Sequence, residues 1–107
     1  MRKIAFIAEA HDLVIAPHNP MGPLATVSNL HLDAATSNFL VQESRKLTPA
    51  EISSVTHVTE AVDGYFPLPK GPGLGIDIVE KRFKEFPYKS SFHRGDRVNP
   101  DNSIAYI

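Results

Sequence analysis

Apolar residues in the first part of the chain fall into two kinds of pattern. Ile4, Ile7 and Ala8 have the spacing of one helical face, which predicts a helix from Arg2 to His11. The continuous apolar run at 13–16 comes next, and such runs are typical of strands that are covered on both faces, as in parallel sheets. The pattern therefore predicts a helix followed by a strand near 13–17.

The same order then repeats further along the chain. An apolar stripe down one side predicts a second helix from Pro23 to about Ser37, with Pro23 well suited to the first helical turn. Asn38 precedes a second buried strand near 39–43. Alternating helices and strands of this kind indicate the α/β fold class with parallel strands. The residues that form the stripe are Leu24, Val27, Leu30 and Ala34.

A rigid loop is expected between the first strand and the second helix. The segment 17–23 reads PHNPMGP, and its three prolines and one glycine prevent regular pairing. His18 lies in this loop, at the end of a predicted parallel strand, which is the edge where barrel enzymes place their catalytic groups.

The second half of the chain has a weaker pattern. Thr48 followed by Pro49 predicts a capped short helix through Ser54, whereas 55–62 suits either a helix or a strand. A turn is expected at 63–64 and a looped or extended stretch after it. A short amphipathic helix is then predicted from Ile78 to Phe86, before a polar and irregular C-terminal segment.

Composition excludes several classes of protein. The chain carries 11 basic and 12 acidic residues without a long block of either sign, so neither nucleic acid nor a membrane surface is an expected partner. The absence of cysteine excludes disulfides, thiolate catalysis and Cys-ligated zinc, and it is compatible with the cytoplasm. No apolar run approaches the roughly 20 residues that a spanning helix needs, so a soluble protein is expected.

Two strings in the sequence resemble a known family. APHNPMGPLATVSNLHLDAATSNFLVQE, at 16–43, resembles the seventh-to-eighth strand region of the mandelate racemase branch of the enolase superfamily, especially galactonate-dehydratase-like sugar-acid dehydratases. DGYFPLPKGPGLGIDI, at 63–78, resembles the segment that follows the eighth strand, and 99–103 resembles the closing stretch.

The resemblance implies a particular place in a larger fold. Members have a capping domain and a modified TIM barrel, and this chain matches about the last quarter of one. Residues 1–60 would then form the last two strand–helix units of the barrel, with strands near 13–17 and 39–43. Residues 61–107 would form a C-terminal connecting segment that packs on the barrel and returns to the capping domain.

The resemblance also implies a reaction. Family members remove the proton α to a carboxylate, and dehydratases then eliminate water from the acid sugar. They bind Mg²⁺ through three carboxylates on the third, fourth and fifth barrel strands. Those carboxylates would precede Met1, so no metal ligand is assigned here and the isolated chain is expected to be inactive. The missing barrel portion or a homo-oligomeric copy is the expected partner.

His18 matches the family's seventh-strand histidine, which acts as a general base or acid. Imidazole chemistry suits either role because the ring exchanges protons near neutral pH. From position alone, a loop residue that caps the next helix is the favoured interpretation of this histidine, and the resemblance reverses that preference.

Glu43 matches the family's eighth-strand glutamate, which donates to or polarises a substrate carboxylate oxygen. Without the resemblance, a glutamate at a strand end is commonly a solvated or helix-capping group. Asn19 and Met21 are further candidates for substrate contact, although loop rigidity alone would explain their neighbours.

Other polar residues receive non-catalytic readings. His31 and Asp33 are expected on the polar side of the second helix, in surface or interhelix contacts. The glycines of KGPGLG lack the Walker pattern, so a phosphate loop is not expected. The remaining positions are read as surface or interface residues: His11, His57, His93, Arg94, Asp96 and Arg97.

Two alternatives stay open. The chain could be a non-catalytic barrel fragment that self-associates or docks on a partner, because exposed parallel edges favour association. It could also belong to a racemase or cycloisomerase, since the same histidine serves several outcomes in this superfamily.

Overall fold

A computed structural model describes residues 1–87 and 101 of the chain. In these residues it has four helices, all of them short. The predictions for His93, Arg94, Asp96, Arg97 and the closing stretch at 99–103 fall largely outside the described residues. The helices are α1 (Arg2–Glu9), α2 (Pro23–Ala34), α3 (Pro49–Ser53) and α4 (Glu80–Glu85).

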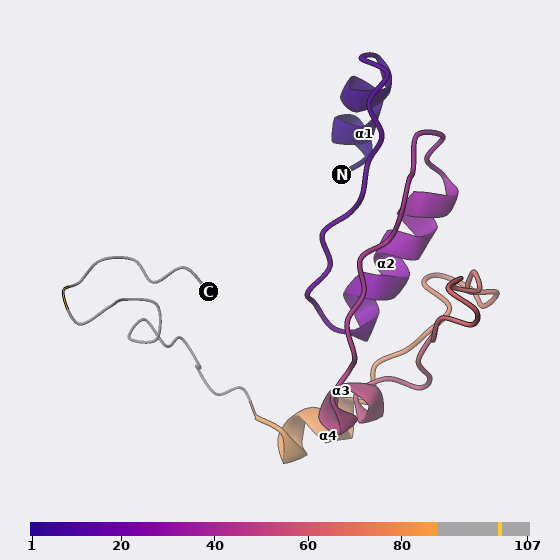
Figure 1. Cartoon of the computed structure of the whole chain (residues 1–107). Helices are drawn as coiled ribbons and strands as arrows, with labels where there is room; N and C mark the ends of the chain where they lie inside the picture. The colour runs from indigo at the N-terminus through magenta and orange to yellow at the C-terminus, as the bar shows by residue number, and fades with distance from the viewer. Residues whose placement is uncertain (88–100, 102–107) are drawn as a thin grey trace.

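Two extended segments lie side by side and run in the same direction, with α2 running back between them along the chain (Figure 1). Ile15 and Phe39 form a parallel bridge, in which the Ile15 N–H donates to Asn38 O and Ile15 O accepts from Leu40 N–H, both at 2.9 Å. The described residues therefore show the order extended segment, helix, extended segment, with an isolated bridge in place of the predicted strand pairing. The pairing is one bridge long, which is shorter than the strands expected near 13–17 and 39–43.

The junction between α1 and the first extended segment is closed by backbone and side-chain bonds. Asp12 has a positive φ of 55°, which reverses the chain and lets the Leu13 N–H donate to Ala8 O at 2.9 Å. The Asn38 amide then donates to Ala5 O at 3.1 Å and to Leu13 O at 2.8 Å. One polar side chain thus joins α1 to both extended segments.

The buried apolar core is small. Within α1 the buried residue is Ala5, whereas Ile4 and Ile7 of the predicted face are 59% and 65% exposed. The helix is thus confirmed but its expected inward face is wrong, because the small Ala5 side chain is the one that packs closely. The core residues are Ala5, Ile15, Val27, Leu30 and Val55.

The buried face of α2 is partly the one expected. Val27 and Leu30 are buried as predicted, but Ala34 is exposed and Asp33 is buried in its place. The prediction that Asp33 lies on the polar side of the helix is therefore wrong. Thr26 also belongs to this buried face, so polar groups form part of the helix packing.

The second half contains a capped helix and two antiparallel contacts. Thr48 and Glu51 form a reciprocal capping box at the start of α3, as the Thr48–Pro49 pair predicted. Val55 pairs with Ile78 in an antiparallel bridge, so the ambiguous stretch is extended at Val55. Ile78 is therefore not helical, and the last helix, α4, begins at Glu80 rather than at the predicted Ile78. Val62 and Tyr65 bond reciprocally around the predicted turn.

That turn is formed by two residues with positive φ. Asp63 has a φ of 52° and Gly64 a φ of 83°, the backbone combination of a tight hairpin turn. Asp and Gly are residue types that tolerate this region. The sequence signal at 63–64 is therefore confirmed.

The paired segments are incompletely covered among residues 1–87 and 101. Four apolar side chains there are more than half exposed, so the covering of both faces expected from the apolar runs is not realised within these residues. The reason is that each segment has one described neighbour, on one side. The open side chains are Leu13, Val14, Leu40 and Val41.

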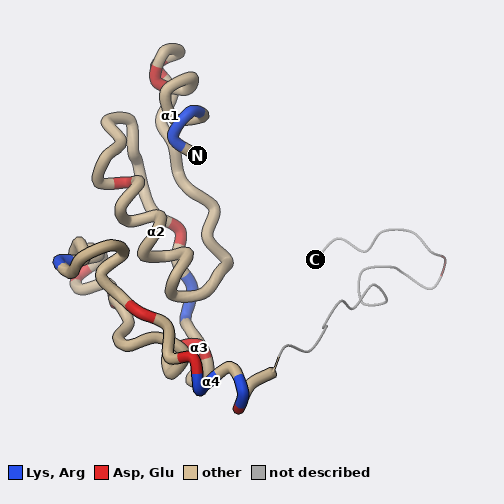
Figure 2. Tube along the Cα trace, turned by 180° about the vertical axis from the view of Figure 1, so that it is seen from behind, with Lys and Arg blue, Asp and Glu red and all other residues tan. Residues whose placement is uncertain are grey.

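Charged residues are spread along the described chain without a large area of one sign (Figure 2). Acidic and basic side chains come together around α3 and α4. No helix in the part of the chain that the structure describes has the length and apolar character needed to cross a bilayer.

Candidate active site

His18 and Glu43 meet where the two extended segments end. His18 Nδ1 lies 2.6 Å from Glu43 Oε2, and the two side chains are 79% and 48% exposed. The parallel arrangement brings them together, because the carboxyl ends of parallel strands lie at the same edge. The structure thus unites the two residues that the sequence singled out most strongly.

The environment of Glu43 favours its charged form. The backbone N–H of Asn19 donates to Glu43 Oε2 at 2.6 Å and is the main cause that lowers the pKa of this carboxyl below its ordinary value. Desolvation is the next largest effect and raises that pKa, whereas the charge and the hydrogen bond of His18 each lower it by less. Glu43 is therefore a carboxylate at neutral pH, an acceptor rather than a donor.

The pairing selects a tautomer of His18. Because a carboxylate only accepts hydrogen bonds, the close His18 Nδ1 must carry the hydrogen that it shares with Glu43. In the neutral ring this leaves Nε2 with a lone pair. The exposed imidazole can then accept or return a proton through Nε2.

Asn19 lies on the opposite side of the loop from His18 and is 1% exposed. Its Nδ2 donates to Thr26 Oγ1 at 2.9 Å and to Glu43 O at 3.3 Å. The observed partners of this amide are thus protein groups. The substrate contact predicted for Asn19 stays a prediction, as does that for Met21, whose side chain is 60% exposed.

Gln42 adds a further link between the two segment ends. Its Nε2 donates to Glu43 O at 2.7 Å and to Pro17 O at 3.3 Å. Pro17 precedes His18, so this amide holds the start of the loop against Glu43. No feature of the sequence distinguishes the role of Gln42 from that of its neighbour.

Arg45 is a loop-holding residue that the sequence reading missed. Its Nε donates to Pro20 O at 2.7 Å, and its guanidinium forms an ion pair with Glu51. That ion pair is the main cause that lowers the pKa of Glu51 to about 2. The capping signature at Thr48 marks Glu51 in the sequence, but nothing there links Glu51 to Arg45.

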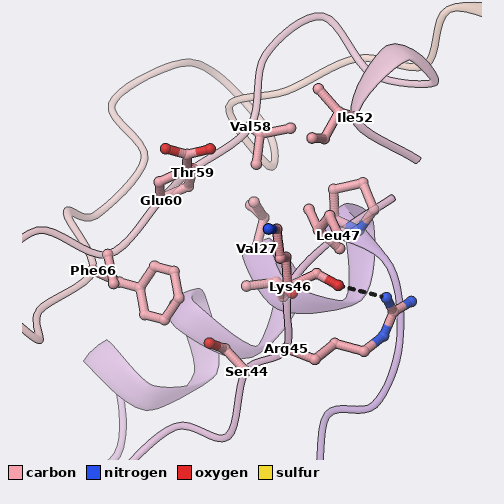
Figure 3. A pocket seen from close by; sticks show the side chains of 13 residues that line it. Val27, Ser44, Arg45, Lys46, Leu47, Ile52, Val58, Thr59, Glu60 and Phe66 are labelled. Carbon is pink, nitrogen blue, oxygen red and sulfur yellow. Dashed lines mark hydrogen bonds between the residues drawn. The ribbon is translucent and has the colours of Figure 1, made fainter. Parts of the chain in front are cut away.

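A cavity of about 370 Å³ lies beside Arg45, between α2 and the chain around 58–66 (Figure 3). Val27, Ile52 and Val58 point toward it from three different segments, and Phe66 closes one side. Its lining includes Thr26 and Arg45 but not His18 or Glu43. The proposed chemistry therefore lies on the exposed edge rather than in this cavity.

The described residues do not form a metal centre. Among residues 1–87 and 101, no group of three or more His, Asp or Glu side chains is placed to hold a metal ion. A set of one histidine and one carboxylate at the segment ends does not fit the oxygen-rich coordination that Mg²⁺ prefers. No step is therefore assigned to a metal held by these residues.

Residues 1–82 match the sequence model of a protein family described as Enolase C-terminal domain-like. The chain belongs to this family. The superfamily assignment made from the PHNP loop and the QE strand end is thus confirmed, as is the α/β class of the fold.

Individual relatives agree with this assignment. A D-galactonate dehydratase family member from Streptomyces bingchenggensis is 32% identical over 94 residues, which cover 86% of this chain and 23% of the relative. The chain therefore spans about a quarter of this relative's length.

Two solved structures show the same relationship in three dimensions. An enolase from Agrobacterium radiobacter, proposed to be a galactarate dehydratase and solved with Na and L-malate, is 37% identical with a TM-score of 0.83. The match includes 100% of this chain and 31% of the Agrobacterium chain. An enolase from Pantoea ananatis with bound D-gluconate and Mg is 33% identical with a TM-score of 0.75, over 82% of this chain and 22% of that one.

Proposed function

We propose that this chain supplies the closing barrel segment of a sugar-acid dehydratase of the enolase superfamily. The observation that carries the proposal is the His18–Glu43 pair at 2.6 Å, placed at the ends of two parallel segments. Relatives that are named for galactonate and galactarate, and one that binds D-gluconate, support an acid sugar as the substrate.

His18 is the proton carrier in this proposal. Its Nε2 takes the proton from the carbon α to the substrate carboxylate, or returns a proton to the substrate, while Nδ1–H stays bonded to Glu43. Loss of the α-proton and of the neighbouring hydroxyl, as water, converts the acid sugar into a 2-keto-3-deoxy acid. The 79% exposure of His18 leaves the ring accessible to such a substrate.

Glu43 orients His18 rather than donating to the substrate. A donor role would need the protonated carboxyl, whereas Asn19 and His18 both favour its ionised form. An anion bonded to Nδ1 fixes the ring and stabilises the imidazolium that forms on proton transfer. This use of Glu43 differs from the substrate contact that the resemblance implies.

The reaction needs groups from a larger assembly. We propose that Mg²⁺ is held by carboxylates outside this chain, where it would stabilise the negative charge that develops on the substrate. Residues 1–60 would pack as the last two barrel units, and 61–107 would return to a capping domain. The partner is the rest of the barrel or a second copy, and the expected compartment is the cytoplasm.

The isolated chain should therefore be inactive. Purified protein with Mg²⁺ and D-galactonate, galactarate or D-gluconate should form no 2-keto-3-deoxy acid above the background. Product formation that disappears in His18→Asn would contradict this statement while supporting the role of His18.

A chimera tests the catalytic proposal itself. Residues 1–82 would replace the matching segment of the Streptomyces relative, and the chimera would be assayed for keto-acid formation from each of the three acids. We expect activity that falls at least about 10³-fold in His18→Asn. A folded chimera whose activity is unchanged by His18→Asn would refute the proposal.

The same chimera separates a dehydratase from a racemase. Incubation in D₂O reports exchange of the α-proton by NMR, and the keto-acid assay reports loss of water. Exchange without keto acid would favour the racemase alternative, whereas both signals together support the dehydratase.

A further inference from the structure

We propose that Asn19 is a positioning residue that holds the His18 loop against the end of the second extended segment, with Thr26 as its anchor. The inference deepens the proposed function, because it rests on His18 as the proton carrier. This role does not depend on contact between Asn19 and the substrate. Its side chain would act by fixing where His18 meets Glu43.

The contacts of Asn19 all lead to the other two elements of the site. Its backbone N–H donates to Glu43 Oε2 at 2.6 Å, and its Nδ2 donates to Glu43 O at 3.3 Å. The same Nδ2 donates to Thr26 Oγ1 at 2.9 Å. One residue therefore bonds both the side chain and the main chain of Glu43, and also reaches α2.

Thr26 gives this contact a fixed base. The residue is 9% exposed, and its Oγ1 donates to Gly22 O at 3.3 Å while accepting from Asn19. Its backbone N–H also donates to Gly22 O, at 3.2 Å. The hydroxyl is thus held by the first turn of α2, at the far end of the loop that carries His18.

Burial makes these hydrogen bonds effective. Asn19 is 1% exposed, so water does not compete for its amide, whereas the neighbouring His18 is 79% exposed and has no packing to hold it. Burial alternates along 15–19, with Pro17 and Asn19 buried and His18 exposed between them, so the Asn19 and His18 side chains leave the chain on opposite sides. The position of His18 therefore depends on bonds made by the residue beside it.

NMR of the imidazole nitrogens in the full chain tests this inference without turnover. The ¹⁵N shifts, recorded where they no longer change with rising pH, show which nitrogen carries the hydrogen. We expect the wild-type His18 to be protonated at Nδ1, with its signals identified by their loss in His18→Gln. Asn19→Ala and Thr26→Val should both shift His18 toward the Nε2–H tautomer.

Asn38→Ala is the matched control. Asn38 also donates two side-chain bonds, to Ala5 O and Leu13 O, but these lie near α1 and away from the site. This variant should lower the melting temperature and leave the His18 shifts unchanged. A tautomer change in Asn38→Ala equal to that in Asn19→Ala would show general destabilisation and overturn the inference.

The remaining outcomes are also decisive. Folded Asn19→Ala or Thr26→Val protein with wild-type His18 shifts would overturn the inference, as would a wild-type His18 without Nδ1–H. If Asn19→Ala does not fold, Thr26→Val decides alone, because it keeps the side-chain volume and removes the hydroxyl with its bonds to Asn19 and Gly22. An inactive chimera with the expected tautomer shifts would contradict the proposed function but not the positioning role.

Discussion

Glu43 Oε2 accepts from the side chain of His18 and from the backbone N–H of Asn19, each at 2.6 Å. One carboxylate oxygen therefore fixes both the imidazole and the loop that bears it. A hydrogen bond to an ionised acceptor is about twice as strong as one between neutral groups. Substitutions at Glu43 should thus act on the orientation of His18 before they act on the fold.

Glu43→Gln should lower the activity of the chimera described above by roughly 10²-fold or more. The amide keeps the size and an acceptor oxygen, but it lacks the charge that stabilises the imidazolium. The measurement is kcat for keto-acid formation, with Glu43→Asp as the matched variant that keeps the charge on a shorter stem. Equal activity of Glu43→Gln and the unmodified chimera would contradict an electrostatic role.

Asp33→Asn should stabilise the protein at pH 8 by up to about 3 kcal/mol and have little effect at pH 4. Burial raises the pKa of Asp33 to about 6, and neither carboxylate oxygen has a hydrogen-bond partner. Because the folded-state pKa lies above the ordinary value of 3.8, the charged form is disfavoured in the fold. The stability that depends on protonated Asp33 is thus fully present below pH 3.8 and is lost as pH rises through about 6.

Chemical denaturation of Asp33→Asn at both pH values measures this effect. Asp63→Asn is the control, because it makes the same chemical change at an exposed turn residue whose positive φ asparagine tolerates. A stabilisation of Asp33→Asn that is the same at pH 4 and pH 8 would rule out the buried charge as its cause.

Glu51→Gln should remove a stabilising contribution of about 1 kcal/mol at neutral pH. The ion pair with Arg45 lowers the pKa of Glu51 to about 2 from an ordinary value of 4.5, so the stabilisation is present above pH 4.5. It is lost as pH falls from 4.5 through about 2. The magnitude is set low because solvent reaches both side chains.

The difference in melting temperature between wild type and Glu51→Gln should therefore shrink between pH 5 and pH 2. Glu60→Gln, at an exposed residue, should show no such change. High salt should weaken the Glu51 contribution as well, because screening reduces the attraction of partly exposed pairs. A difference that stays constant down to pH 2 would exclude the Arg45–Glu51 pair as its source.

Leu40→Lys should weaken self-association of the isolated chain. Leu40 is 63% exposed on the paired segments, which carry three other apolar side chains that are more than half exposed. Exposed apolar patches and strand edges favour contact with another chain. Sedimentation velocity over a range of concentrations should show assembly of the wild type and less of it in Leu40→Lys.

Ile7→Lys is the control for that experiment, since Ile7 is 65% exposed but lies on α1. Equal loss of assembly in both variants would indicate that general hydrophobicity, and not the exposed apolar residues of the paired segments, drives association. Monomeric wild-type protein at all concentrations would contradict the prediction.

Local signals in the sequence determined most of the elements. The period of the apolar residues predicted α1 and α2, the Thr48–Pro49 pair predicted α3, and Asp63–Gly64 predicted the tight turn. These features depend on propensity, capping and backbone freedom within a few residues, which a sequence displays directly. His18 and Glu43 were also found from the sequence, through the motif that contains them.

Tertiary structure alone decided which side chains face inward and what holds the site together. Ala5 is buried in place of Ile4 and Ile7, and Asp33 in place of Ala34, because close packing depends on neighbours from distant segments. The bonds of Asn19 to Thr26 and Glu43, and of Arg45 to Pro20, likewise join residues that share no sequence pattern. The sequence determined the chemical groups, and the meeting of two parallel segments decided that the His18 ring faces a carboxylate.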